Sequence, residues 1–293
     1  MPKMIAVDWG TTRMRAYLLG QNDTILAQIV RADGGMQGVA AGQFPAVLAS
    51  VIAPWLAEHP HLPVIMAGMV GARNGWVEAA YAKTPASAAD VAAQMLAVTR
   101  QDGGTAMIVP GVSHKDAAGC DVMRGEETLI FGCAGDGLVV LPGTHSKWAQ
   151  VLDGKITGFA TYMTGELFAF VRGSSILSRL AEEPEDEAGF SLGLAAAQAR
   201  DGFTHQLFTA RSNVLLGAMR GTEVGPYLSG LLIGAEILGA RGRFGAATSV
   251  TLVAEGQMAA LYGQALQFFG ISARMITPEQ ALVAGLAKIR HFL

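Results

Sequence analysis

The chain has 293 residues, of which 51% are hydrophobic and 15% are charged, and its formal net charge is −3. This length can bury a large core and suits two domains. The weak charge, without a basic cluster, excludes a nucleic-acid partner, and the longest apolar tract, near 231–238, is too short for a membrane span of about 20 residues.

The strands and helices of the first half follow from apolar patterning. Short alternating or continuous apolar runs predict strands, and longer periodic runs predict helices. The expected elements are strands near 4–8, 13–19 and 24–30, a helix near 44–58, a strand at 63–67, a helix near 86–100, a strand near 106–109 and a helix near 117–132.

The second half repeats this order around an inserted segment. We expect strands near 138–142, 147–152 and 156–162, a helical insertion over about 165–241, a strand at 250–253, a helix near 257–269 and a strand near 272–276. The acidic stretch at 182–187 is typical of a solvated loop. The last helix begins at Thr277, with Pro278 in its first position and Gln280 completing a capping box.

Each half therefore has the order β-β-β-α-β-α-β-α, which predicts the α/β class with helices on the faces of each sheet. The duplication predicts two similar domains, residues 1–134 and residues 135–293, the second carrying the insertion at about 165–241. A cleft between them would be lined by strand ends, where open α/β sheets usually bind ligands.

Two polar hairpins carry the strongest chemical signal. The first is Asp8–Arg13, which follows an apolar strand, and the second is Gly143–Lys147, at the matching place in the second half. Backbone N–H groups and hydroxyls in such turns can hold phosphate oxygens, so two copies predict a nucleotide triphosphate site. The predicted contacts are Gly10, Thr11, Thr12, Gly143, Thr144, His145, Ser146 and Lys147.

Asp8 and Lys147 each have a simpler alternative. Mg²⁺ prefers one or two carboxylates plus phosphate oxygens, so Asp8 is our candidate metal ligand and catalytic residue. The alternative is an Asp that bonds its own turn. Lys147 is equally compatible with a phosphate contact and with an ordinary solvated position on a strand.

The segment Arg124–Thr128 offers a general base. A carboxylate near a helix start, facing a cleft, can take a proton from a sugar hydroxyl, and Glu126 is our first choice. Asp121 and Glu127 are reserves. The alternative is that acidic residues occupy a first helical turn because they interact favourably with the helix dipole.

Two further loops follow strands at matching places. The Gly-rich loop 68–76 suits a small polar substrate, with Gly68, Met69, Arg73 and Trp76 as contacts, although Trp76 could equally anchor the core. Its counterpart 254–256 (Ala254, Glu255 and Gly256) would leave room for adenine and ribose. Gly230 and Gly234 could bring a helix close to the nucleotide, or could serve helix packing.

The first hairpin resembles the first phosphate motif of the sugar-kinase, actin and Hsp70 superfamily. Over nearly its whole length the chain resembles the 2-dehydro-3-deoxygalactonokinase family more narrowly. The collinear matching segments are 66–71 (MAGMVG), 122–128 (VMRGEET), 141–148 (LPGTHSKW), 163–166 (MTGE, with Glu166 on the substrate side) and 228–236 (LSGLLIGAE).

The resemblance implies two RNase H-like domains of the actin and hexokinase type that close over their substrates. It implies ATP-dependent phosphorylation of 2-dehydro-3-deoxy-D-galactonate at the C6 hydroxyl, in galactonate breakdown, with Mg²⁺. Glu126 is the position most similar to the acidic base of distant sugar kinases, which usually have Asp there. The gluconate epimer is an open alternative substrate, and a superfamily ATPase or phosphohydrolase is a lesser alternative activity.

The acceptor's carboxylate requires a cation or several N–H donors. Arg73, Arg124 and Arg172 are candidates, and their spacing does not choose between them. Cys120 and Cys133 lack metal or redox spacing, and no signal peptide is visible, so we expect a cytoplasmic protein. The small-residue helices of the insertion could form a homodimer surface or pack internally.

Overall fold

The computed structural model describes residues 1–293 and divides into two compact units. Unit 1 comprises 1–136, 151–159 and 277–293, and unit 2 comprises 137–150 and 160–276. The predicted boundary at 134/135 therefore differs from the observed division, because a hairpin segment and the C-terminal helix return to unit 1.

Unit 1 contains a six-stranded mixed sheet in the order β3-β2-β1-β4-β7-β6. Neighbours β1 and β2 are antiparallel, whereas β1, β4 and β7 run parallel, so their carboxyl ends share one edge. The strands are β1 (Pro2–Trp9), β2 (Met14–Gly20), β3 (Ile25–Arg31), β4 (Val64–Ala67), β6 (Leu96–Thr99) and β7 (Thr105–Ile108). Helix α1 (Phe44–Glu58) buries its apolar side in the core of this sheet, as predicted.

Two predicted helices of unit 1 were wrong over much of their length. The segment 86–100 forms only the short α2 (Ala88–Ala92) and then β6, which pairs with β7 through a tight turn. The segment 117–132 begins as a hairpin, because Asp116 accepts a hydrogen bond from the Ala118 N–H and Gly119 takes a φ of 137°. Strands β5 (Tyr81–Lys83), β8 (Gly111–Asp116) and β9 (Gly119–Met123) form a small sheet, and α3 spans only Glu126–Gly132.

Helix α9 (Pro278–Arg290) begins with the predicted capping box at Thr277 and Gln280, which is confirmed. It packs closely on α3 in unit 1. A Cβ on Gly285 would lie 1.8 Å from the Thr128 carbonyl oxygen, and one on Gly132 would lie 1.8 Å from that of Ala281. The two glycines therefore allow backbone contact between the first and last segments of this unit.

Unit 2 is built on a five-stranded sheet in the order β12-β11-β10-β13-β14, with β10, β13 and β14 parallel. All five strands were predicted, and so was α8 (Gly256–Phe268), which follows β13. The strands are β10 (Gly137–Leu141), β11 (Ser146–Leu152), β12 (Lys155–Tyr162), β13 (Ser249–Val253) and β14 (Ser272–Ile276); the division between units falls within β11 and β12.

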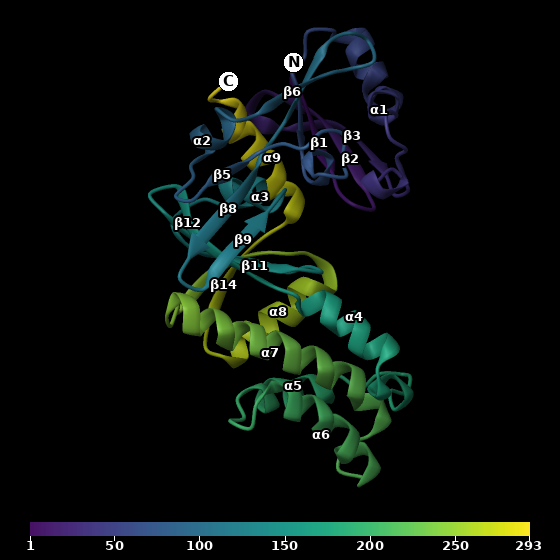
Figure 1. Cartoon of the computed structure of the whole chain (residues 1–293), viewed down its shortest axis with the longest axis vertical. Helices are drawn as coiled ribbons and strands as arrows, with labels where there is room; N and C mark the ends of the chain where they lie inside the picture. Colours follow the sequence, from purple (N-terminus) through teal and green to yellow (C-terminus); the bar gives the residue numbers. More distant parts are fainter. The chain divides into compact units, whose positions relative to one another are not determined.

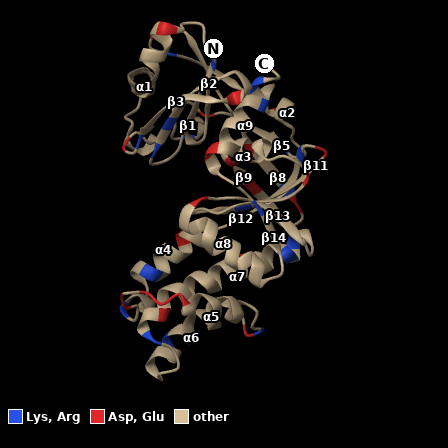
Figure 2. Cartoon of the chain, turned by 180° about the vertical axis from the view of Figure 1, so that it is seen from behind, with Lys and Arg blue, Asp and Glu red and all other residues tan.

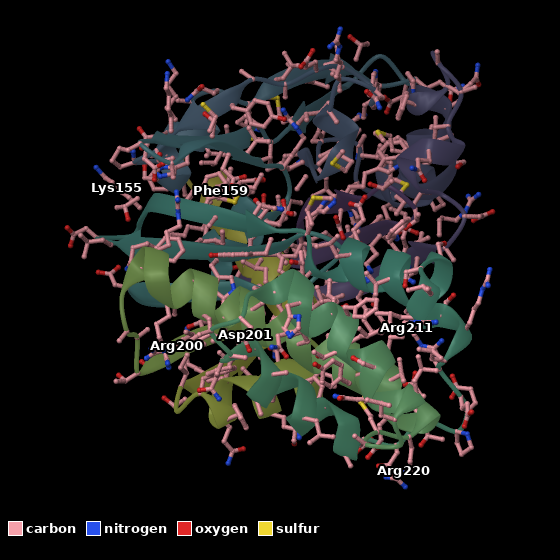
Figure 3. All side chains as sticks on the ribbon, turned by 60° about the horizontal axis from the view of Figure 1, so that its bottom comes forward. Lys155, Phe159, Arg200, Asp201, Arg211 and Arg220 are labelled. Carbon is pink, nitrogen blue, oxygen red and sulfur yellow. The ribbon has the colours of Figure 1, made fainter.

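The helical insertion is confirmed and consists of α4 (Thr164–Ser174), α5 (Ala188–Ala197), α6 (Phe203–Leu215) and α7 (Val224–Phe244). Figure 1 shows α5 and α6 beside the long α7. Helices α5 and α7 run in the same direction, because Gly193 approaches the Tyr227 carbonyl while Gly189 approaches that of Glu223. Figure 3 shows Arg200 and Arg220 at opposite ends of this pair.

The acidic stretch before α5 is held by arginines. Arg172 on α4 pairs with Glu183 at 2.8 Å and Glu185 at 3.1 Å, and Arg220 pairs with Asp186 at 2.6 Å. Figure 2 shows this segment in red beside α5 and α6. The stretch is therefore a fastened loop rather than a freely solvated one. No helix in the chain combines the length and apolar character that crossing a bilayer requires.

Candidate functional site

The first hairpin is closed and braced by main-chain hydrogen bonds. The Gly10 N–H donates to the Arg13 carbonyl at 2.9 Å. The carbonyls of Gly10 and Thr11 accept from the N–H groups of Met36 and Gln37 at 2.9 and 3.0 Å. With its carbonyls committed, the hairpin presents an exposed Thr12 and a half-buried Thr11, as a phosphate-binding turn would.

Trp9, within this hairpin, is an anchor. Its side chain is fully buried, its Nε1 donates to the Gly34 carbonyl at 2.9 Å, and its ring lies 5.5 Å from that of Phe44. Trp76 stacks on Phe44, with ring centroids 6.2 Å apart, and packs against the same core. Aromatic stacking favours the alternative, a core anchor, and the substrate contact of Trp76 stays a prediction.

Asp8 lies at the end of β1, half-buried, with its carboxylate 3.5 Å from the guanidinium of Arg15 on β2. Burial raises the pKa of Asp8, the Arg15 charge opposes that rise, and the charge of Glu126 adds to it. Sequence reasoning missed Arg15. The signal was the hairpin itself, because Asp8 and Arg15 are cross-strand partners in it.

Three chain segments meet beside Asp8. Gly68 follows β4 with a φ of 94°, and a Cβ there would lie 2.9 Å from the Trp9 carbonyl oxygen. Gly125 has a φ of 107°, and a Cβ there would lie 3.1 Å from the Gly68 Cα. Only glycine fits both places. The structure thus brings Gly68 and the start of α3, with Glu126, to the same strand edge as Asp8.

Glu126 and Glu127 have different surroundings. Glu126 is half-buried, and its carboxylate accepts from the Arg124 N–H at 3.0 Å. Glu127 is fully buried and accepts from the Gly125 N–H at 2.7 Å and from the Thr128 hydroxyl at 2.9 Å. Burial, with the neighbouring charge of Glu126, raises the pKa of Glu127 to about 8. Glu127 therefore holds the turn before α3, and Glu126 is the carboxylate nearer to solvent.

Arg124 is a buried clamp. Its Nη2 donates to the Ala79 carbonyl at 2.7 Å and its guanidinium lies 4.2 Å above the Tyr81 ring, while Nε and Nη1 are buried without a partner. The side chain fastens loop 68–79 to the small sheet, and its predicted place in the substrate pocket stays a prediction. Arg73 is exposed, and Met69 packs against the core of unit 1.

The second hairpin is held from inside unit 2. Ser146 is fully buried, and its hydroxyl accepts from the Gly143 N–H at 3.4 Å and lies 2.9 Å from the Tyr262 hydroxyl. The buried hydroxyl is therefore committed inside unit 2, and the predicted phosphate contact of Ser146 stays a prediction. Lys147 is also buried and donates to the His145 carbonyl at 3.2 Å, so it is not an ordinary solvated lysine.

Thr144 and His145 form the exposed tip of this hairpin. His145 Nε2 lies 2.5 Å from a Glu166 carboxylate oxygen, and the Glu166 N–H donates to the Thr144 carbonyl at 3.0 Å. Glu166, predicted on the substrate side, braces the second hairpin, and its substrate contact stays a prediction. A Cβ on Gly165 would lie 2.5 Å from the Gly143 carbonyl oxygen, so the start of α4 lies directly against the turn.

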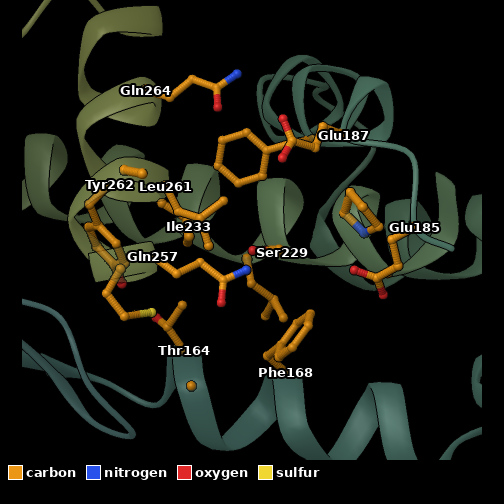
Figure 4. Close-up of a pocket in the computed structure, with 17 residues that line it drawn as sticks. Thr164, Phe168, Glu185, Glu187, Ser229, Ile233, Gln257, Leu261, Tyr262 and Gln264 are labelled. Carbon is orange, nitrogen blue, oxygen red and sulfur yellow. The ribbon is translucent and has the colours of Figure 1, made fainter. Parts of the chain in front are cut away.

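A cavity of about 400 Å³ adjoins this contact within unit 2. It is lined by α4, α7, α8 and the fastened acidic loop, and its size is within the range of small-molecule sites, roughly 300–1,000 Å³. Thr164 and Tyr262 lie toward one end in Figure 4, and Gln264 and Glu187 toward another. The lining residues used below are Thr164, Gly165, Ser229, Gln257, Tyr262 and Gln264.

The predicted nucleotide contacts on α7 and before α8 lie beside this cavity rather than in it. Ser229 and Ile233 line it, whereas Gly230 and Gly234 face α5: a Cβ on Gly230 would lie 2.1 Å from the Phe190 carbonyl oxygen. One residue along a helix turns the side chain by about 100°. The nucleotide role of both glycines is corrected to helix packing.

The predicted nucleotide contacts in the turn before α8 also lie beside the cavity rather than in it. Ala254 is buried, Glu255 is exposed and Gly256 begins α8 with a φ of 58°, but the cavity lining begins one residue later, at Gln257. The predicted segment therefore shapes the entry of the helix and does not line the cavity. Sequence reasoning missed Ser229, Gln257 and Tyr262, because helical rotation and side-chain length decide which positions reach a cavity.

The comparisons with known proteins agree on one kinase family over nearly the whole chain. The family described as 2-keto-3-deoxy-galactonokinase matches residues 8–289. The 2-dehydro-3-deoxygalactonokinase of Escherichia coli is 37% identical, covering 99% of this chain and 98% of the relative. A protein of Rhizobium meliloti assigned to the same kinase is 38% identical, covering 96% of this chain and 94% of the relative.

Solved structures extend this similarity to the fold. The crystal structure of a Sinorhizobium meliloti protein assigned to 2-dehydro-3-deoxygalactonokinase is 35% identical, with a TM-score of 0.87 over 98% of both chains. The activator of 2-hydroxyisocaproyl-CoA dehydratase from Clostridium difficile, with bound ADPNP, is 10% identical with a TM-score of 0.53 over 99% of this chain and 95% of the other. The second similarity concerns the fold alone and agrees with the expected actin-like α/β class.

Proposed function

Because the chain belongs to the 2-keto-3-deoxy-galactonokinase family, a family of carbohydrate kinases, we propose that it transfers a phosphate from ATP to 2-dehydro-3-deoxy-D-galactonate. The acceptor is the terminal C6 hydroxyl, and the products are the 6-phosphate and ADP. The full-length identity to the E. coli kinase carries the substrate assignment. A cytoplasmic location is part of the proposal, since ATP is the donor.

The nucleotide is proposed to bind with its phosphates at the two hairpins and its adenosine in the unit 2 cavity. Support comes from Gly165, which touches the second hairpin with one side and lines the cavity with another. A cavity of about 400 Å³ is large enough for a nucleoside. Gln257, Gln264 and Ser229 supply donors and acceptors for base and ribose.

Asp8 is proposed to hold Mg²⁺. No cluster of three or more His, Cys, Asp or Glu residues suits a metal cage, but Mg²⁺ is commonly bound by one or two carboxylates together with phosphate oxygens. When bound, the ion neutralises negative charge on the phosphates during transfer. Asp8 fits this donor set, because its half-buried carboxylate lies at the first hairpin.

Glu126 is proposed as the general base that accepts the proton of the C6 hydroxyl. It lies on the same strand edge as Asp8, and its carboxylate is more accessible than that of Glu127. Glu127 keeps its proton near neutral pH, because its pKa is about 8, and so it does not compete as base. Distant relatives usually place Asp here, and Glu126 extends the carboxylate by one methylene.

Arg73 is proposed to bind the carboxylate of the sugar acid. Of the three arginines considered, Arg124 clamps its own loop and Arg172 pairs with the acidic stretch. Arg73 is exposed in the loop that follows Gly68, beside the strand edge that carries Asp8. A guanidinium can bind a carboxylate through two parallel hydrogen bonds, which suits this substrate.

A coupled assay of ADP release tests the proposal. The acceptors are 2-dehydro-3-deoxygalactonate, its gluconate epimer and intact galactonate, each with Mg²⁺ and ATP. ADP release that depends on the first acceptor and gives its 6-phosphate supports the proposal, and preference for the epimer would reassign the substrate. ADP release that ignores all three acceptors would instead support an ATPase or phosphohydrolase.

The homodimer remains a prediction. Helices α5 and α7 use their glycines to pack on each other, so these small-residue faces are occupied within the chain. Sedimentation of the purified protein would determine its oligomeric state.

A further inference from the structure

One buried carboxylate on α7 connects β11, α4 and α8 beside the proposed nucleotide site of unit 2. Glu236 on α7 is 2% exposed. Its Oε1 accepts from Trp148 Nε1 on β11 at 2.8 Å, and its Oε2 accepts from the Tyr262 hydroxyl on α8 at 2.7 Å and from the Thr164 hydroxyl at the start of α4. Burying a carboxylate is costly without such donors, so three donors on one buried group indicate a specific role.

Two of these donors line the cavity. Thr164 and Tyr262 are lining residues, and the residue after Thr164, Gly165, lies against the backbone of Gly143 and Thr144. A shift of Glu236 would therefore move the floor of the cavity and the support of the second hairpin together.

The same network reaches the hairpin by a second route. The Tyr262 hydroxyl donates its single hydrogen to Glu236, so its oxygen accepts from the Ser146 hydroxyl. The Ser146 oxygen in turn accepts from the Gly143 N–H. The hydrogen atoms of this relay all point toward the carboxylate, and the relay ends on the first backbone amide of the phosphate turn.

We propose that Glu236 is a positioning residue for the nucleotide, which holds the second phosphate hairpin in register with the adenosine cavity through Ser146, Thr164 and Tyr262. The inference rests on the proposed nucleotide site and adds a role for a residue that touches no substrate. The consequence is coupled binding. The base and the phosphates of one nucleotide bind together only while the hairpin and the cavity keep this register.

Glu236→Gln tests the coupling, because the amide keeps the volume but brings a donor where the relay needs acceptors. Binding of adenosine alone and of AMPPNP with Mg²⁺ is measured by calorimetry. We expect adenosine affinity within about twofold of wild type and AMPPNP affinity lower by about tenfold, the effect of losing one charge-assisted hydrogen bond. In the kinase assay the KM for ATP should rise, while the KM for the sugar acid should not.

Glu223→Gln is the matched control. Glu223 is also a largely buried carboxylate of unit 2, but it pairs with Arg220 and lies outside the cavity lining. It should lower the melting temperature without separating the two affinities. Tyr262→Phe, which removes the relay hydroxyl alone, gives the same test if Glu236→Gln does not fold.

The outcomes are separable. Equal loss of adenosine and AMPPNP binding in Glu236→Gln, or no loss of either, would overturn the positioning role while leaving the kinase proposal standing. A wild-type protein that binds neither ligand would overturn the proposed nucleotide site itself.

Discussion

The two hairpins proposed to bind phosphate have similar sequences but are held in place differently. The hairpin of unit 1 is braced by backbone hydrogen bonds from Met36 and Gln37, and its Asp8 remains at the strand end with Arg15. The hairpin of unit 2 is held by buried side chains, Ser146, Tyr262 and Glu236. A main-chain brace depends little on side-chain identity, whereas a side-chain relay is sensitive to a single atom.

The largest expected effect is on the hairpin of unit 1, which carries the proposed metal ligand Asp8. Asp8→Ala should lower kcat by about 10³-fold, since it removes the proposed anchor of Mg²⁺. Asp33→Ala, at an exposed acid near the same hairpin, should leave kcat unchanged. Steady-state kinetics with saturating sugar acid measure both variants. Turnover of Asp8→Ala close to wild type would remove the metal role.

Glu126→Gln probes the base beside the first hairpin. We expect kcat to fall by about 10²-fold, the lower part of the range for general bases, because phosphoryl transfer depends more on positioning and charge. Affinity for AMPPNP, measured by calorimetry, should stay within about twofold. If turnover is nearly normal, Asp121 becomes the next candidate base.

Two glycine substitutions test the fastening of each hairpin. A Cβ at Gly35 would lie 2.1 Å from the carbonyl carbon of Thr12, and one at Gly165 would lie 2.5 Å from the Gly143 carbonyl oxygen. Gly35→Ala and Gly165→Ala should each raise the KM for ATP by about tenfold, a loss of about 1.4 kcal/mol.

The controls for these substitutions come from the same segments. Gly38→Ala meets its nearest atom at 3.4 Å, and Gly173→Ala, on the same helix as Gly165, meets nothing within 4 Å. Neither should change the KM for ATP, and Gly173→Ala should stabilise the protein by up to about 1 kcal/mol. Equal KM values in clashing and control variants would contradict the proposed roles of the hairpins.

The last prediction concerns stability and pH, and no hairpin. The pKa of Glu127 is about 8 in the folded protein, against 4.5 for the unperturbed group. Between these values the unfolded chain has released the proton that the folded protein keeps, so stability falls as pH rises, by at most about 1.4 kcal/mol per pH unit. Glu127→Gln should therefore gain in melting temperature relative to wild type from pH 5 to pH 8. A constant difference would contradict the raised pKa.

The sequence predicted repeated strands well and helices near turns poorly. In the strands of both hairpins, apolar residues either alternate with polar ones or follow each other without a break, and few other structures have these patterns. The segment 117–132 failed because its small apolar residues suit a helix, while the bond from Asp116 and the φ of Gly119 close a hairpin. Such turn chemistry is local, and it outweighed helix propensity.

The sequence indicates a candidate site where backbone motifs define it, and it gives no sign of the positions that packing decides. Asp8 and Gly68 lie at the ends of β1 and β4, whose parallel order brings them to one edge, and Gly125 lies against Gly68. Gly230 and Gly234 were misjudged because a glycine on a helix serves a ligand or a neighbouring helix equally well in sequence. Only the position of α5 decides between them.

By itself, the sequence determined the duplicated α/β order, the two polar hairpins, the capped last helix and the family, because these depend on local patterns and collinear motifs. Only the tertiary structure decided that Ser146 points inward, that Arg124 clamps its own loop and that Glu236 gathers three donors from β11, α4 and α8. These contacts join residues up to 116 positions apart. Their partners are chosen by packing, which no local pattern records.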